Sequence, residues 1–243
     1  MSKDPKKKII VPTPLSAEID LISQSKLEGF ETLDKAWLRN PSNTLKYILE
    51  VLPLISSIPA RKICWPSIPE ITNVDCTLIQ KCNTLHYLAQ EALSDEKIRM
   101  VVAAPLFTPT NAQFIHGDFK PDNLLISKNG SSTALVDWEN SGIGHPDFDL
   151  ASLLAGLIFV SVRSVVKEDD TDWVSLNKFL KNLDFVGKTW MHSKSCSEHF
   201  HIILAKYLFV RLCGYYNEIE EDDRCAFVMK TLLKNYATRN SIR

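Results

Sequence analysis

The chain has 243 residues, of which 45% are hydrophobic and 23% are charged, values typical of a soluble globular protein with a sizeable core. Its formal net charge of −1 argues against a general electrostatic attraction to nucleic acid or to a membrane surface. The lysine-rich start is not followed by an apolar segment, so no secretory signal is predicted. The six cysteines are therefore expected to be reduced thiols in the cytoplasm.

The N-terminal part of the chain combines short strands with helical periodicity. Strands are predicted at residues 9–12 and 19–23, where prolines interrupt the apolar pattern. From Asp34 onward the pattern turns helical, and Ser42 or Asn43 is a suitable N-cap for the first long helix. The elements predicted next are helices at residues 43–55, 76–93 and 95–103 and a proline-rich loop at residues 58–69.

The C-terminal part is predicted to hold one hairpin followed by helices only. Its strands are predicted at residues 113–115, 124–126 and 133–136. Asn129-Gly130, a strong turn signal, joins the last two strands as a hairpin. The helices are predicted at residues 148–166, 173–183, 196–216 and 223–237. The apolar run at residues 150–162 is too short to cross a bilayer and indicates a buried helix.

The strongest chemical signal is FIHGDFKPDNLLI, followed after the hairpin by ALVDWEN. Asp118 and Asn123 are five residues apart on one loop, and the hairpin returns Asp137 to the side of that loop. We therefore expect these three side chains to lie close together. A chance polar turn would explain Asp118 alone, but it explains the joint pattern poorly.

Phosphoryl transfer needs this set of groups. One carboxylate must orient the attacking hydroxyl and accept its proton, and a second carboxylate with an amide oxygen must hold Mg²⁺ on the phosphates. We assign Asp118 to the first role, and Asn123 and Asp137 to the second. Lys120 is predicted to neutralise charge on the transferred phosphate. His116 completes the predicted catalytic group, more as a brace for the loop than as a base.

HGDFKPDN followed by DWEN resembles the aminoglycoside phosphotransferase and choline kinase superfamily, whose members have a protein-kinase-like fold. The segment GIGHPDFDLASLL is similar to the family's G-x-x-x-x-D-L-A segment and implies that Asp149 braces the catalytic loop. The resemblance implies the same roles for Asp118, Asn123 and Asp137. Lys120 departs from the commonest family pattern and matches the loop lysine of protein kinases. The acceptor is therefore expected to be a hydroxyl of a small molecule or of a peptide.

The resemblance also implies a nucleotide site for ATP or GTP. The expected fold class is α/β (α+β), with a tail at residues 1–8, an N-lobe remnant and hinge at residues 9–33, and a helical C-lobe at residues 34–243. The predicted hinge, whose backbone would bind adenine, consists of Leu27, Glu28, Gly29 and Phe30. About 25 residues precede it. They leave too little room for the family's phosphate-binding lobe, and no lysine among them has the expected strand context.

Three interpretations follow from this short N-terminal part. A partner chain completes the nucleotide site, or the chain binds nucleotide through its hinge and metal site alone, or it is a degenerate, pseudokinase-like binding or assembly subunit. The intact trio of Asp118, Asn123 and Asp137 favours an enzyme, because a scaffold has no chemical need for all three.

Overall fold

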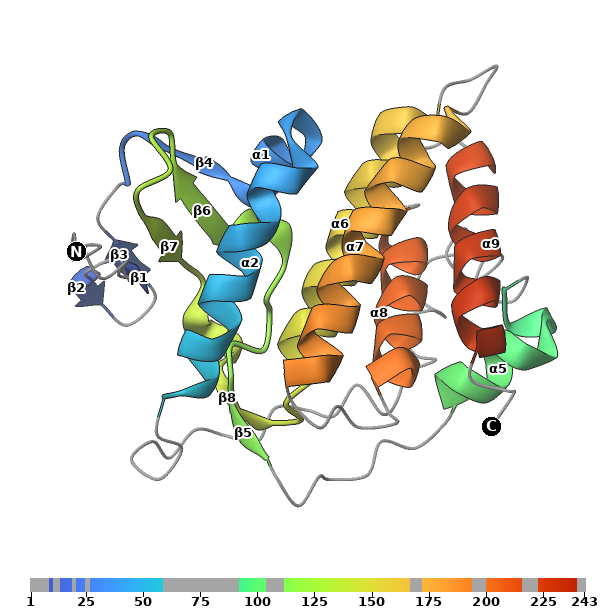
Figure 1. Cartoon of the computed structure of the whole chain (residues 1–243). Coiled ribbons are helices and arrows are strands. Elements are labelled where there is room, and N and C mark those ends of the chain that lie inside the picture. Colours follow the sequence, from blue (N-terminus) through green and yellow to red (C-terminus); the bar gives the residue numbers. More distant parts are fainter. Residues whose placement is uncertain are drawn as a thin grey trace.

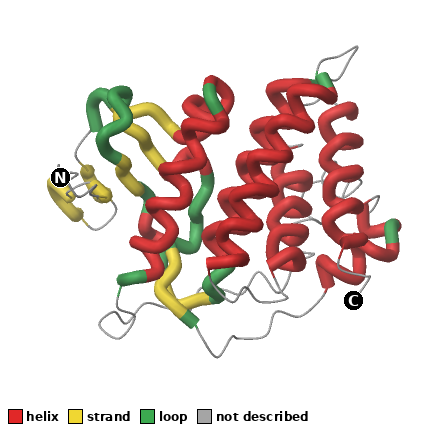
Figure 2. Tube along the Cα trace, viewed as in Figure 1, coloured by secondary structure: helices red, strands yellow, loops and turns green. Residues whose placement is uncertain are grey.

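The structure is a computed structural model that describes residues 9–10, 14–18, 21–24, 27–58, 92–103, 112–166, 172–193, 200–215 and 223–239. The predicted tail, nearly all of the predicted proline-rich loop and most of the helix predicted at residues 76–93 lie outside these ranges. A sheet and a helical bundle lie on opposite sides of the molecule, with the first two helices between them (Figure 1). Helices make up the side away from the N-terminal strands (Figure 2).

The largest sheet of the described chain is built around the predicted hairpin. Its strands are β1 (Ile9–Ile10), β4 (Phe30–Thr32), β6 (Leu124–Ser127) and β7 (Thr133–Leu135), in the order β1-β7-β6-β4. The β6–β7 hairpin is confirmed, with Leu124 opposite Leu135. Gly130 has a φ of +69° in its turn, and a Cβ there would lie 2.4 Å from the Tyr47 hydroxyl oxygen. Glycine therefore meets both the backbone and the packing requirement.

Two smaller sheets differ in part from the predicted strands. β2 (Pro14–Glu18) pairs antiparallel with β3 (Leu21–Gln24), so the predicted strand at residues 19–23 is displaced towards its C-terminal end. The prolines hid β2, although Pro14 takes the first strand position, where a missing N–H group is tolerated. β5 (Gln113–Ile115) is confirmed, and its partner β8 (Gly142–Gly144) was not predicted.

The described helices agree with the predicted helical pattern. They are α1 (Leu33–Arg39), α2 (Pro41–Ser56), α5 (Glu96–Ala103), α6 (Phe148–Val165), α7 (Trp173–Ser193), α8 (Phe200–Tyr215) and α9 (Asp223–Arg239). The N-cap of α2 is Asn40 rather than Ser42 or Asn43, because its side chain accepts a hydrogen bond from the Asn43 N–H. α7 continues ten residues past the predicted end at Leu183, since buried Val186 extends its packed face.

α6 is the central helix of the core and packs against α1, α7, α8 and α9. Among the described helices it alone is long and apolar enough to cross a membrane, and 78% of its 18-residue window is buried. The prediction of a buried helix is therefore confirmed. The Trp37 indole N–H donates to the Ser161 hydroxyl at 2.9 Å and ties α1 to α6. α6 also contacts the loop that precedes β6, because Gly156 lies against Pro121.

Replacing Gly156 with alanine is predicted to destabilise the fold. The new Cβ would lie 2.5 Å from Pro121 Cδ. Such overpacking costs about 1–3 kcal/mol, against a gain in helix propensity of about 1 kcal/mol. We expect a lower midpoint of denaturant unfolding. The matched control is Gly187→Ala in α7, where the nearest atom, Phe200 Cε1, would be 4.0 Å from the new Cβ. The control should be neutral or stabilising, and equal effects of the two substitutions would contradict this packing.

Candidate active site

The loop between β5 and β6 is held by a carboxylate at the start of α6. Asp149 is buried, and its two oxygens accept hydrogen bonds from the backbone N–H groups of His116 at 2.8 Å and Gly117 at 3.0 Å. Gly117 has a φ of +82°, which lets the chain turn sharply before Asp118. Burial raises the pKa of the Asp149 carboxyl to about 6, although the two backbone hydrogen bonds act in the opposite direction.

His116 is fully buried and engaged through both ring nitrogens. Its Nε2 lies 2.9 Å from the Val136 carbonyl oxygen, and its Nδ1 accepts from the Asp118 backbone N–H at 3.4 Å. This pattern fits a neutral imidazole that carries its proton on Nε2. Burial lowers the pKa of His116, which also favours the neutral ring. The ring packs against Trp138, with centroids 4.6 Å apart. His116 thus joins the loop to the segment after β7 that carries Asp137.

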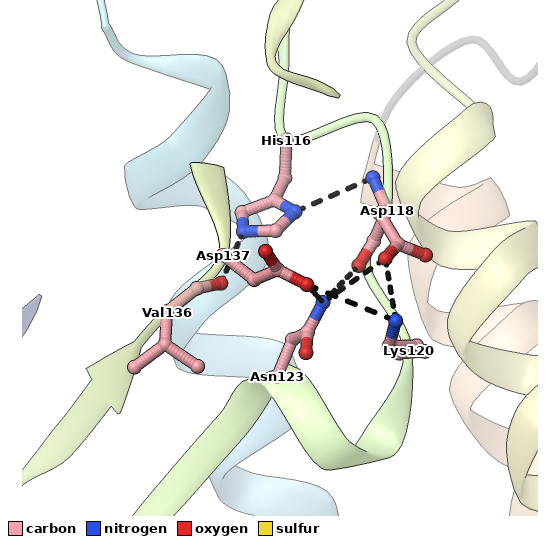
Figure 3. Close-up of polar contacts among 6 residues, drawn as sticks. All are labelled: His116, Asp118, Lys120, Asn123, Val136 and Asp137. Atoms are coloured by element: carbon pink, nitrogen blue, oxygen red, sulfur yellow. Dashed lines mark hydrogen bonds and ion pairs between the residues drawn. The ribbon is translucent and has the colours of Figure 1, made fainter. Parts of the chain in front are cut away.

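The structure brings Asp118, Asn123 and Asp137 together (Figure 3). The Asn123 amide nitrogen donates to the Asp118 backbone carbonyl at 2.8 Å, and it lies 3.3 Å from one carboxylate oxygen each of Asp118 and Asp137. Asn123 is buried, whereas the side chains of Asp118 and Asp137 are 26% and 39% exposed. Two carboxylates that solvent can reach therefore lie around one buried amide.

Lys120 is the cation of this cluster. Its ammonium lies 2.7 Å from Asp118 Oδ2 and 3.8 Å from Asp137 Oδ2 (Figure 3). Burial acts to lower the pKa of Lys120, but the hydrogen bond to Asp118 and the charges of both aspartates outweigh it and raise the pKa. Lys120 therefore keeps its charge and reduces the repulsion between the two carboxylates.

Asp137 has an unusual backbone conformation. Its φ of 65° and ψ of 58° lie in the left-handed region, and it is the only described residue other than glycine with a positive φ. The backbone N–H of Val136 donates to the Asn123 carbonyl at 3.0 Å, and the Trp138 indole donates to the Leu135 carbonyl at 2.8 Å. These flanking contacts hold the conformation. Backbone strain of this kind concentrates at functional sites, where it directs a side chain.

The predicted hinge lies beside the other end of the hairpin. The Gly29 carbonyl accepts a hydrogen bond from the Lys128 N–H at 2.9 Å, and Phe30 pairs with Ser127 at the end of β6 that is remote from Asn123. The structure does not bring Leu27, Glu28, Gly29 or Phe30 into the cluster of Asp118 and Asp137. Because the Gly29 carbonyl is engaged, adenine recognition would fall to other backbone groups of the segment, and that role stays a prediction.

Sequence reasoning missed two α8 residues near the loop. Tyr207 is buried in the core, and its burial, together with the charges of Asp149 and Asp118, raises its pKa. The positive charge of Arg211 acts on Lys120 and Asp122. The arginine follows tyrosine by one helical turn, so the two residues share a face of α8. This face of α8 lies near the loop because α8 packs on α6. No local sequence pattern predicts that tertiary contact.

The Asp149→Asn variant tests the raised pKa. Between about pH 4 and pH 6, the Asp149 carboxyl is protonated in the native protein and ionised in the unfolded chain. Its contribution to the free energy of unfolding therefore falls as pH rises through this range, by at most about 3 kcal/mol. The variant lacks this contribution. The free energy of unfolding of wild type minus that of the variant should therefore decrease from pH 4.5 to pH 7 in urea titrations. A constant or increasing difference would contradict the assignment.

Comparisons with known proteins bear on the family and the fold of the chain. A family model described as "Phosphotransferase enzyme family" matches residues 49–174, just over half of the chain. No curated protein matches significantly. Among solved structures, the apo form of a thermostable mutant of aminoglycoside phosphotransferase APH(4)-Ia aligns with a TM-score of 0.60 and 14% identity, covering 97% of this chain and 79% of that one.

Two further structures extend the likeness. The same phosphotransferase in ternary complex with AMP-PNP and hygromycin B gives a TM-score of 0.57 and 14% identity over 98% of this chain and 78% of that one. A choline/ethanolamine kinase family protein from Mesorhizobium loti gives a TM-score of 0.51 and 15% identity, covering 96% of this chain and 74% of that one. At these identities the structures bear on the fold alone. The family match over Asp118, Asn123 and Asp137, together with the kinase-like fold, shows that the chain belongs to the phosphotransferase enzyme family.

Proposed function

We propose that the chain transfers the γ-phosphoryl group of ATP or GTP to a hydroxyl of a small molecule or peptide, with Mg²⁺ as cofactor. The observation that carries this proposal is the convergence of the Asp118 and Asp137 carboxylates on the Asn123 amide nitrogen, which lies 3.3 Å from an oxygen of each. Family membership supports phosphoryl transfer in general. The nucleotide, the metal and the acceptor follow from the chemistry of the site and belong to the proposal.

Asp118 is proposed to orient the acceptor hydroxyl and to take its proton. Its carboxylate is partly exposed, so a hydroxyl can approach it, and Lys120 holds one of its oxygens at 2.7 Å. The ammonium lies between Asp118 and Asp137, where negative charge gathers on the transferred group. His116 and Asp149 are positioning residues, because each accepts hydrogen bonds from backbone N–H groups of the loop and His116 is fully buried.

Asp137 and Asn123 are proposed to hold Mg²⁺, and the residues present fit this ion. Mg²⁺ prefers a few carboxylate and amide oxygens, with water and phosphate completing its shell, and no cluster of three His, Cys, Asp or Glu side chains competes for it among the described residues. Bound there, the ion would neutralise charge on the phosphates. The Asn123 amide nitrogen faces the carboxylates in this structure, so the side chain must rotate to offer its oxygen.

The geometry of the carboxylates favours an enzyme over a degenerate scaffold. Keeping Asp118 and Asp137 close together costs electrostatic free energy that Lys120 must offset, and the left-handed backbone of Asp137 adds strain. A scaffold would gain nothing from this arrangement. The solved neighbours include a complex with AMP-PNP, which supports nucleotide binding by the same fold. We also propose that a partner chain completes the phosphate site. The protein is further proposed to be cytoplasmic.

Substituting Asp137 with alanine should remove magnesium-dependent nucleotide binding, because the metal loses its only proposed carboxylate ligand. We expect ATP affinity in the presence of Mg²⁺ to fall at least about tenfold, measured by isothermal titration calorimetry. The matched control is Glu139→Ala, which removes an exposed carboxylate two residues away. Unchanged affinity in the Asp137 variant, or an equal loss in the control, would place the metal elsewhere.

Substituting Asp118 with alanine should affect turnover rather than binding. Loss of a positioned base lowers kcat by about 10²–10⁴-fold, whereas the proposed metal ligands remain in place. ATP turnover with a panel of hydroxyl acceptors measures the first effect, and calorimetric titration with magnesium and ATP measures the second. If the variant kept full activity, Asp118 would have no part in the mechanism.

A further inference from the structure

A second polar site lies at the turn of the β6–β7 hairpin, beside the start of α2. It is a hollow of about 350 Å³ lined by α1, α2 and residues 126–130. Tyr47 links its two walls, since its hydroxyl donates to the Gly130 carbonyl at 3.2 Å. Asn123 is at the opposite end of β6, so the hollow is separate from the proposed catalytic site. Its volume lies within the range of small-molecule pockets, about 300–1,000 Å³.

The charges around this hollow do not balance. Its lining includes Arg39, Lys46 and Lys128 but one carboxylate, Glu31. Both oxygens of Glu31 bind the Arg39 guanidinium, and this hydrogen bonding lowers the pKa of Glu31. Within the described part of the chain, no carboxylate lies within ion-pair distance of the Lys46 or Lys128 ammonium. Lys46 and Lys128 therefore form no close ion pair there, and the only carboxylate of the lining that the Lys128 charge acts on, Glu31, is already bound to Arg39.

Several groups around the hollow are already placed to meet an anion. The Lys46 ammonium lies 4.8 Å from the centre of the Tyr47 ring, which restricts its position. The Asn129 side-chain oxygen accepts from Ser131, which leaves its amide N–H groups to donate. The first turn of α2 carries no acidic residue that would repel an anion.

We propose that this hollow binds a small phosphate-bearing molecule. A phosphate group carries about two negative charges and three acceptor oxygens. These match the ammonium groups of Lys46 and Lys128, which form no close ion pair with a described carboxylate, and the amide donors of the lining. A single carboxylate carries only one negative charge and would neutralise only one of the two ammonium groups. The hollow also has room for an organic group beside the phosphate. The proposal does not depend on the catalytic role of Asp118.

The test compares charge reversal inside and outside the hollow in the full chain. Lys46→Glu/Lys128→Glu removes the site, and Lys97→Glu/Lys178→Glu, on α5 and α7, makes the same change in net charge on exposed residues elsewhere. The probes are ribose 5-phosphate and inorganic phosphate, titrated without Mg²⁺ at constant ionic strength. Phosphate stabilises most proteins unspecifically, so the readout is the saturable part of the rise in melting temperature.

We expect saturable binding by wild type and by the control, and at least a tenfold weaker apparent Kd in the Lys46/Lys128 variant. Lys46→Gln/Lys128→Gln is a milder change that should also weaken binding. It provides the test if the charge-reversed variant does not fold. Lys120→Met should bind as wild type does, which separates the hollow from the catalytic loop. Tighter binding of ribose 5-phosphate identifies an organic phosphate as occupant, and equal binding identifies the free ion. No saturable binding by wild type, or equal weakening in the control, overturns the proposal.

Discussion

Two carboxylates held around one amide are the constraint on which the site depends. Asp118 and Asp137 would repel each other if nothing offset their charge, and Lys120 and the Asn123 amide nitrogen now do so at distances of 2.7–3.8 Å. Such a cluster is poised to take a divalent cation, because a cation relieves the same repulsion. The interactions that hold the two carboxylates together are therefore those that a metal and a triphosphate would rearrange.

The rest of the fold keeps this cluster in place. The hairpin fixes Asp137 relative to Asn123 through the pairing of Leu124 with Leu135, and α6 fixes the loop through Asp149 at its first turn. Gly156, further along α6, admits Pro121 of the same loop. Because α6 is packed on several sides by other helices and is mostly buried, the loop rests on a central helix of the core.

Much of this arrangement could be predicted from the sequence, because it is encoded locally. Asn129-Gly130 specified the hairpin, apolar periodicity specified α6, and the loop spacing placed Asn123 beside Asp118. Long-range features could not be predicted in this way. The contribution of Arg211 depends on how α8 packs on α6, the extension of α7 depends on burial of Val186, and Pro14 concealed an edge strand. The Lys128–Gly29 hydrogen bond, which changes how the predicted hinge could act, also requires the tertiary pairing of β4 with β6.

The most direct test of the central claim is a crystal structure with Mn²⁺ and a non-hydrolysable ATP analogue, in which anomalous scattering locates the metal. The account predicts Mn²⁺ bound by an Asp137 carboxylate oxygen and by the Asn123 amide oxygen, with the Asn123 side chain rotated from its present orientation. A bound analogue whose metal touches neither residue would contradict the account.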